Sequence, residues 1–377
     1  MAINKTDKVL NVPTLRFPGF TDKWEKKRVG DIAKLSKGAG ISKDDRSISG
    51  VPCILYGELY TTYNSEIINK VVSKTELPLD NLVQSEGNDV IIPSSGESAI
   101  DISTARCITT SGILLGGDLN IIRLKNDDGR FLSYQLNGVR KLDIAKVAQG
   151  VSVVHLYGDA LKSISVSLPH IDEQKKIADF LSLLDERIAL QSKLIDRLKS
   201  LMDGIIDKVT ALTPNISIRD CLDCYSSTLQ ECETEEQGTY PVYGANGVCG
   251  YLDYATISAP AILIVKDGSG VGNVSYANGD CSVVGTLNYL QPKKDVSAKF
   301  LYFVLKRFNF QPYKTGMAIP HIYFKAYSKT RIFCPDYEEQ TRMAASLSRI
   351  EDKIALEERL LCLQKEQKHY LLSAMFI

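Results

Sequence analysis

The sequence predicts an α+β protein in which one unit, a globular domain followed by a long helix, occurs twice along a chain of 377 residues. Three observations predict this fold class: an internal repeat, an apolar heptad pattern in two segments, and short β-branched runs between them. The composition, with 44% hydrophobic and 24% charged residues, is typical of a folded globular protein.

The repeat is clearest in two segments, 169–191 and 335–357, which align without a gap. Both open on Pro-x-x-x-Glu-Gln and continue with the spacing of an amphipathic helix. Upstream the same offset pairs Gly150 with Gly316 and His155 with His321, whereas Tyr56-Gly57 matches Tyr243-Gly244 at a larger offset. The second globular part is therefore shorter than the first.

Both repeated segments carry apolar residues at alternating spacings of four and three, over about four heptads. Such a pattern predicts a coiled coil. If the globular domains lie at opposite ends of the helices, the second helix must run back along the first, which predicts an antiparallel pair with a pseudo-two-fold axis. Two amphipathic helices on separate domains are the alternative. The central seam positions, which are also the candidates for partner docking, are Leu181, Leu184, Ile188, Leu347, Ile350 and Ile354.

The segments between the helices predict short strands, because β-branched apolar runs are separated by Gly, Asn, Asp and Ser. One helix is predicted in each globular part, over 131–147 and 299–310. The expected domains are 1–168, a first helix over 169–213, 214–333, and a second helix over 334–377.

Motifs for common catalytic chemistries are missing. The chain has neither a GxxxxGK[ST] phosphate loop nor the Asn/Asp-Pro-Pro-aromatic motif of amino-methyltransferases. Asp267–Asn273 is glycine-rich but lacks GxGxxG spacing, which favours a tight turn. Cys221-x-x-Cys224 has no second pair, which favours free thiols over a zinc site. We therefore predict a non-catalytic chain that holds neither a metal nor a cofactor.

An odd number of cysteines, nine, predicts reduced thiols and a cytoplasmic location. No apolar run approaches the ~18–20 residues that span a bilayer, so no membrane association is expected. The first residues also lack the apolar core of a signal peptide.

The net charge is zero, yet Lys and Arg gather in residues 293–331, which hold nine of them and one acidic residue, Asp295. Aromatic residues are interleaved with these cations, among which Lys306, Arg307 and Lys314 stand close together. Lys and Arg neutralise phosphates, and polar and aromatic groups reach bases. The segment therefore predicts nucleic-acid contact; a solvated helix face over an aromatic core is the alternative.

Taken together, these features resemble the specificity subunit of type I restriction–modification enzymes (HsdS). The resemblance covers the whole chain in its order of domain, helix, domain and helix. It rests on the duplicated Pro-x-x-x-Glu-Gln opening at 169–174 and 335–340, and on the lead-in Leu15–Phe20, Trp24 and Val29–Ile32.

The resemblance implies that the globular parts are target recognition domains, each binding one half of a split sequence in double-stranded DNA. It implies that the helices act as spacers on which two methylation subunits dock, and that restriction subunits join for cleavage. S-adenosylmethionine, ATP and magnesium would then belong to those partners.

The paired segments before each helix are the candidate DNA contacts, because glycine allows close backbone approach and polar side chains can read base edges. These candidates are Gln149, Gly150, Ser152, His155, Lys314, Gly316 and His321, together with Lys306 and Arg307. A structural role is the alternative for the two histidines, since base-reading residues should differ between the domains.

Two other functions compete with DNA recognition. A coiled-coil assembly protein would use its lobes to bind other proteins, and a stand-alone nuclease or methyltransferase would need the motifs that are missing here.

Overall fold

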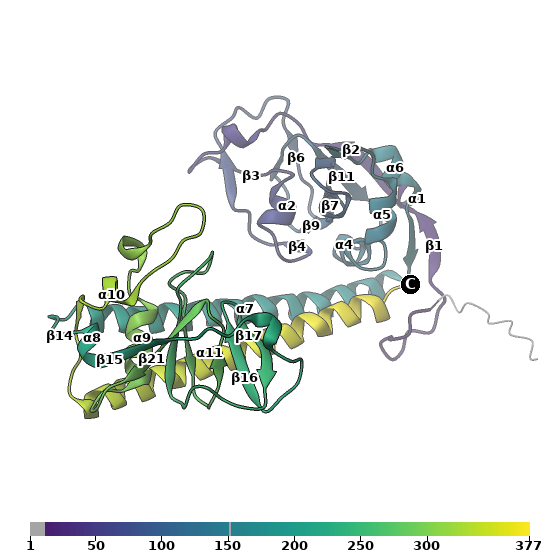
Figure 1. The fold of residues 1–377 in the computed structure, drawn as a ribbon. Coiled ribbons are helices and arrows are strands. Elements are labelled where there is room, and N and C mark those ends of the chain that lie inside the picture. Colours follow the sequence, from purple (N-terminus) through teal and green to yellow (C-terminus); the bar gives the residue numbers. More distant parts are fainter. Residues whose placement is uncertain (1–11, 151) are drawn as a thin grey trace, which may run out of the picture. The chain divides into compact units, whose positions relative to one another are not determined.

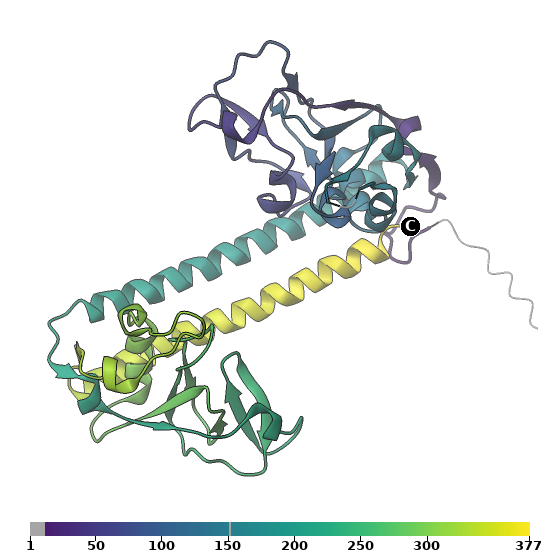
Figure 2. The same ribbon diagram turned by 45° about the horizontal axis from the view of Figure 1, so that its top comes forward.

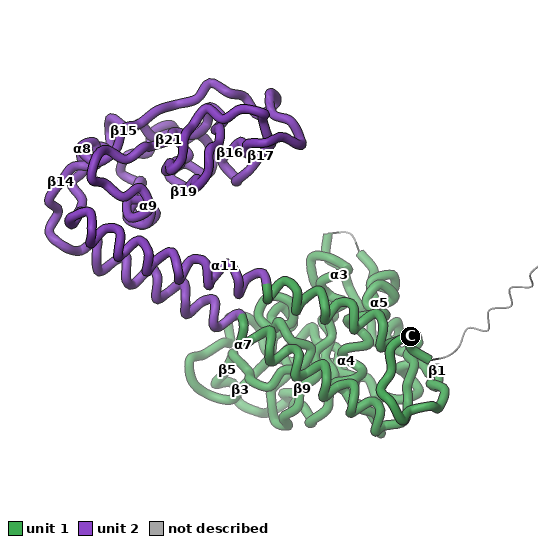
Figure 3. Tube along the Cα trace, turned by 90° about the horizontal axis from the view of Figure 1, so that it is seen from below, with its two compact units in different colours: residues 1–191, 360–377 green, residues 192–359 purple. Residues whose placement is uncertain are grey.

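The computed structural model describes residues 12–150 and 152–377, which form two compact units (Figure 3). Unit 1 comprises residues 1–191 and 360–377, and unit 2 comprises residues 192–359. Each unit therefore combines one globular part with half of both long helices.

The two long helices are α7 (Ile171–Thr210) and α11 (Tyr337–Ala374), both uninterrupted (Figure 2). The first half of α7 shares unit 1 with the second half of α11, and the reverse holds in unit 2. Because the start of each long helix shares a unit with the end of the other, the helix pair is antiparallel. The expected fold class, α+β with an internal repeat and an antiparallel helix pair, is confirmed.

The predicted seam residues are buried or half-buried along both helices. In unit 1, Leu181 and Leu184 lie in one apolar cluster with Leu371 and Met375. In unit 2, the ammonium of Lys199 lies 2.6 Å from a carboxylate oxygen of Glu358 on the facing helix.

Unit 1 contains a five-stranded sheet, a four-stranded sheet and two strand pairs (Figure 1). The five strands, in spatial order, are β2 (Ala33–Lys37), β11 (Leu119–Leu124), β7 (Asp89–Pro93), β9 (Arg106–Ile108) and β4 (Ile67–Ile68). The four are β5 (Ser73–Thr75), β3 (Val51–Ile54), β10 (Leu114–Leu115) and β6 (Val83–Gln84). The pairs are β1 (Glu25–Arg28) with β13 (Ser165–Leu168), and β8 (Ser95–Gly96) with β12 (Val154–His155). The short helices are η1 (Lys43–Asp45), α1 (Val29–Ile32), α2 (Glu58–Thr61), α3 (Ala99–Ile102), α4 (Gly129–Asn137), α5 (Lys141–Val147) and α6 (Gly158–Ser163).

Both faces of the five-stranded sheet are covered, which explains why β7 is a continuous apolar run. Successive side chains of a strand point to opposite faces. Accordingly, Val90 and Ile92 pack in the cluster that also holds Trp24 and the long helices, whereas Ile91 packs in a second cluster with Leu59. Trp24 is 1% exposed, so its role is packing.

Unit 2 repeats this plan with fewer strands. Its four-stranded sheet contains, in order, β15 (Leu222–Ser226), β21 (Leu287–Pro292), β18 (Ala261–Val265) and β19 (Val274–Ala277). A three-stranded sheet contains β17 (Gly247–Leu252), β16 (Tyr240–Gly244) and β20 (Ser282–Val283), and β14 (Ile216–Ser217) pairs with β22 (Arg331–Ile332). The short helices are η2 (Glu231–Glu233), η3 (Gln311–Tyr313), α8 (Ile218–Cys221), α9 (Ala298–Lys306) and α10 (Phe324–Tyr327).

One predicted element is wrong in detail. The helix expected over 131–147 is two helices, α4 and α5, because α4 ends at Asn137, directly before Gly138. A Cβ at Gly138 would lie 3.2 Å from the carbonyl oxygen of Tyr134 and 3.3 Å from Leu372 of α11, and both close approaches favour glycine. Among the described residues, no helix is both long and apolar enough to cross a membrane.

Candidate functional site

The duplicated Pro-x-x-x-Glu-Gln motif fixes the start of each long helix to its globular domain. Gln174 is 1% exposed, and its Oε1 accepts a hydrogen bond from the backbone N–H of Asp128, 3.0 Å away. Its Nε2 donates to the carbonyl of Pro169 at 2.9 Å. Gln340 repeats both contacts in unit 2, with the N–H of Ser297 and the carbonyl of Pro335, each at 2.8 Å. Asp128 and Ser297 are the N-caps of α4 and α9, so the motif clamps equivalent helices.

This clamp predicts a measurable loss of stability. Gln174→Met keeps the side-chain volume but leaves the buried N–H of Asp128 without its acceptor, a change that costs about 1–3 kcal/mol. Trp24 is the one tryptophan of the chain and lies in the core of unit 1, so its fluorescence in a urea titration follows this unit. Gln367→Met, at an exposed position of α11, is the matched control and should leave the midpoint unchanged. Equal midpoints for both variants would contradict the clamp.

The predicted DNA contacts of unit 1 gather on one loop, which two backbone hydrogen bonds close. Gln149 N–H donates to the carbonyl of His155 at 2.9 Å, and His155 N–H donates back at 2.7 Å. In unit 2, Thr315 and His321 form the same pair of bonds at 2.9 and 2.8 Å. We call these segments, 149–155 and 315–321, the paired loops; residue 151 lies outside the described residues.

A glycine is required in each paired loop. Gly150 has a φ of +120° and Gly316 a φ of +86°, in the region that other residues rarely adopt. A Cβ at these positions would also collide with the carbonyl oxygens of Val153 and Ile319, respectively. The repeated glycines are thus explained by the backbone of the loops.

Each paired loop ends on a histidine whose ring contacts a tyrosine. The ring of His155 stacks on Tyr157, with centroids 6.2 Å apart, and the ring of His321 meets Tyr323 edge-on at 4.9 Å. His155 is exposed and His321 half-buried. Further exposed side chains on or beside the loops are Gln149, Ser152, Val153, Tyr157, Met317, Ile319 and Tyr323. Lys314 precedes the second loop and is half-buried.

Lys306 and Arg307 lie elsewhere, at the end of α9, where carboxylates of the long helices already match their charge. The Lys306 ammonium is 3.2 Å from Glu351 of α11. The Arg307 guanidinium donates to both carboxylate oxygens of Asp207 on α7, at 2.9 and 2.8 Å. Lys306 and Arg307, which belong to the basic segment 293–331, therefore form ion pairs within unit 2.

A tyrosine–carboxylate bond beside this cluster occurs in both units. The hydroxyl of Tyr302 donates to Glu351 at 2.6 Å, and that of Tyr134 donates to Asp185 at 2.7 Å. Burial would raise the pKa of the Glu351 carboxyl, but hydrogen bonds from Tyr302 and Lys299 lower it below its usual value. Asp185 and Glu351 occupy equivalent positions of the two helices, whereas the two tyrosines differ by one position from their helix N-caps.

The six seam residues proposed for partner docking face the interior of their own units. Leu181 and Leu347 are 0% and 3% exposed, and the other four are buried or half-buried. A second apolar stripe, which we had not predicted, remains exposed on the same helices at spacings of seven and four residues. Its members are Leu183, Leu190, Leu194 and Leu201 on α7, and Leu356, Leu363 and Tyr370 on α11. The heptad spacing of these residues is the sequence signal that could have revealed this stripe.

A family model described as the type I restriction modification DNA specificity domain matches the chain twice, over residues 21–200 and 223–362. Each match contains one globular part and the greater part of the helix that follows it.

Two curated relatives share parts of the sequence. The chain is 27% identical, over 55% of its length, to the specificity subunit of the type I restriction enzyme MjaVIII of Methanocaldococcus jannaschii. It is 24% identical, over 31% of its length, to that of the type I restriction enzyme EcoprrI of Escherichia coli. These matches span 46% and 29% of the relatives, less than half of either.

Solved structures share the fold along nearly the whole chain. The S subunit of a type I restriction–modification system from M. genitalium has a TM-score of 0.70 at 18% identity, covering 97% of this chain and 99% of that one. A chain from a structural study of complex assembly in the type I R-M system has a TM-score of 0.52 at 15% identity, covering 95% and 98%.

Proposed function

Because the chain belongs to the type I restriction modification DNA specificity family, we propose that it selects the DNA sequence on which a type I restriction–modification complex acts. Each unit would read one half of a bipartite target in double-stranded DNA. The observation that carries this proposal is the coincidence of two family matches with two copies of one fold.

We propose that the paired loops contact features that both half-sites share. Both loops keep one glycine and one histidine, and a tyrosine follows each loop two residues later, although the half-sites of a split target differ. The sugar–phosphate backbone is common to every sequence, and contacts to it position a protein without specifying bases. Gln149, Ser152 and His155 in unit 1, with Lys314 and His321 in unit 2, would be the contacting side chains, and their partial or full exposure supports this role.

The exposed stripe is the surface we propose for the methylation subunits. Leu190 and Leu356 are 65% and 61% exposed and occupy equivalent positions of the repeat. Two equivalent rows of exposed apolar side chains suit two copies of one partner, since repeated exposure of large apolar groups on one helix is a candidate protein interface. Restriction subunits would join for cleavage. S-adenosylmethionine, ATP and magnesium would belong to these partners, and this chain would have no catalytic activity of its own.

Changing Leu190 and Leu356 together to Glu should separate this chain from its partner. Both side chains are largely exposed, so the fold should persist, while two carboxylates would be buried unpaired in the interface. After co-expression with a type I methylation subunit, the wild-type chain should co-purify and the complex should retain target DNA in competition with unrelated DNA. The double variant should lose both properties.

The matched control is Leu142→Glu with Tyr254→Glu, which alters exposed apolar side chains, 63% and 57% exposed, away from the long helices. This control should assemble normally. Normal assembly of the Leu190 and Leu356 variant would contradict the docking surface. A wild-type complex that assembles but shows no preference among DNA sequences would contradict the proposed function itself.

A further inference from the structure

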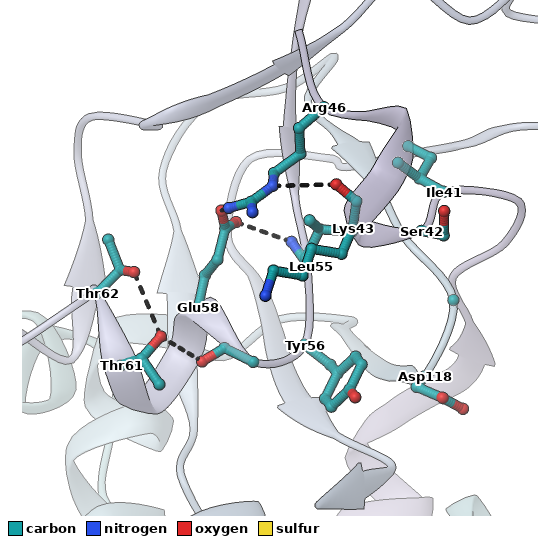
Figure 4. A pocket seen from close by; sticks show the side chains of 12 residues that line it. Ile41, Ser42, Lys43, Arg46, Leu55, Tyr56, Glu58, Thr61, Thr62 and Asp118 are labelled. Atoms are coloured by element: carbon teal, nitrogen blue, oxygen red, sulfur yellow. Dashed lines mark hydrogen bonds and ion pairs between the residues drawn. The ribbon is translucent and has the colours of Figure 1, made fainter.

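Unit 1 contains a pocket of about 500 Å³ between η1 and the turn that follows β3 (Figure 4). Lys43 and Arg46 lie on its rim, both exposed, and the buried carboxylate of Glu58 lies beneath them. One guanidinium nitrogen of Arg46 is 3.9 Å from Glu58, and its Nε donates to the carbonyl of Lys43 at 3.2 Å. These contacts hold the guanidinium over the pocket. Asp118 and Tyr56 line the opposite side.

Unit 2 contains a second pocket, of about 560 Å³, between η2 and the turn that joins β16 to β17. Its rim carries Glu231 and Asn246, both exposed. Cys249 and Thr286 are among its other lining residues.

Strand pairing shows that the two pockets are copies of one site. β3 runs parallel to β10 with Ile54 opposite Leu115, and β16 runs parallel to β20 with Tyr243 opposite Val283. Each pocket is formed by residues at or just after the ends of these four strands: 55–58 and 117–118 in unit 1, and 244–247 and 285–286 in unit 2.

The turns on the other side of the pockets also correspond. A capping box fixes η1, in which Ser42 and Asp45 bond to each other's backbone, and Gln230 and Glu233 do the same for η2. The frame of the site is therefore retained in both units. When the two units are aligned by these strand pairs, Tyr56 corresponds to Ala245. The sequence match of Tyr56-Gly57 with Tyr243-Gly244 is therefore wrong.

The side chains on this shared frame have diverged in charge. Lys43 of unit 1 corresponds to Glu231 of unit 2, a reversal of charge at the same place on the rim. Gly57 corresponds to Asn246, and Asp118 to Thr286. The paired loops differ less, because they keep their closing backbone hydrogen bonds, the glycine and the histidine.

Two domains that bind different half-sites need their base-contacting sites at the same place in the fold but with different side chains. Resting on the function proposed above, we propose that the rims of these pockets are the places where the two units read bases. The rim of unit 1 is Lys43 with Arg46, and that of unit 2 is Glu231 with Asn246. The hollow behind each rim leaves room for water, which commonly bridges side chains to base edges.

The donors and acceptors on each rim define which base edge it fits. Lys and Arg only donate hydrogen bonds, so the rim of unit 1 faces acceptors, as on the O6 and N7 edge of guanine. A carboxylate only accepts, and an amide both accepts and donates. The rim of unit 2 therefore faces an exocyclic amino group, on cytosine or adenine.

The test is methylome sequencing of cells that express the complex with altered rims. Lys43→Ala with Arg46→Ala should change or relax bases in one half-site only, and Glu231→Ala with Asn246→Ala should do so in the other half-site only. Lys70→Ala and Asn278→Ala, exposed positions outside the pockets, should leave both half-sites unchanged.

A variant complex that no longer methylates is tested by binding. With labelled duplexes that carry one base change in one half-site, the rim variant should lose discrimination at that half-site by about 5- to 150-fold, the range of one good base contact. Unchanged discrimination at both half-sites, or a simultaneous change in both, would overturn the inference. A wild-type complex without sequence preference would instead overturn the proposed function.

Discussion

Replacing Lys368 with Met should destabilise unit 1 by about 3–5 kcal/mol, because it removes one partner of a buried ion pair. Lys368 lies on α11, its side chain 14% exposed, paired with Glu66 and with Asp185 of α7, the latter at 2.5 Å. Glu66 and Asp185 are themselves 9% and 8% exposed. Met fits the space, since the residue one repeat earlier is the buried Met202, but it removes the ammonium that contacts both carboxylates and leaves Arg106 as the nearby cation.

The loss should depend on pH in a defined direction. Burial, as the largest cause, raises the pKa of the Glu66 carboxyl above its ordinary 4.5 despite the attraction of Lys368. A carboxyl with a raised folded-state pKa favours the folded state below that pKa and loses this contribution as pH rises. Without Lys368 the Glu66 carboxyl is even harder to ionise than in the wild type. The stability deficit of the Lys368→Met variant should therefore shrink as pH falls from about 8 towards 5.

Urea unfolding followed by Trp24 fluorescence measures both effects in unit 1. Lys365→Met, at an exposed position of the same helix, is the matched control and should be close to wild type. Adding Glu66→Gln to Lys368→Met should restore part of the loss. A Lys368→Met variant that is as stable as the Lys365→Met control at pH 8 would show that the ion cluster does not hold α11 in unit 1.

Lengthening both long helices by one heptad should lengthen the unspecified gap in the recognised sequence by roughly three base pairs. Seven residues restore the apolar seam and add ~10 Å at 1.5 Å per residue. That length corresponds to about 3 base pairs at ~34 Å per ten. The insertion points follow Gln191 and Glu357, at or near the residues where α7 and α11 pass from one unit to the other.

Methylome sequencing of the insertion variant should show both half-sites unchanged and the gap longer, at reduced efficiency, because the second half-site is also rotated around the duplex. Insertion into α7 alone is the control and should impair assembly, since it puts the seam out of register. An active double insertion with the original gap would contradict the spacer role, and altered half-site bases would place base reading on the helices.

The elements that local sequence determines were predictable. The long helices follow from heptads, and β7, β11 and β18 are apolar, β-branched runs of the kind that predicts strands. The break at Gly138 was available from the sequence but missed, because a glycine directly after an apolar helical pattern is a helix-end signal; only the close approach of Leu372 of α11 needed the fold.

The site was predictable only where it obeys the repeat with a fixed offset. The paired loops are related by the same offset as the two long helices, so the sequence alone grouped their residues as one candidate site. The pockets do not obey this offset: their frames depend on parallel strand pairing between distant segments, and their side chains differ. Lys368 occupies a seam position, but its partner Glu66 is 302 residues away, so only the fold reveals why a cation stands there.

The central claim is that this chain determines which DNA sequence a type I complex recognises, and that each of its two units recognises one half-site. Methylome sequencing of a host that lacks other methylation systems, expressing this chain with its methylation subunit, tests it most directly. We expect one methylated motif made of two specified blocks separated by an unspecified gap of fixed length. Methylation at a single uninterrupted motif, or methylation without sequence preference, would contradict the claim.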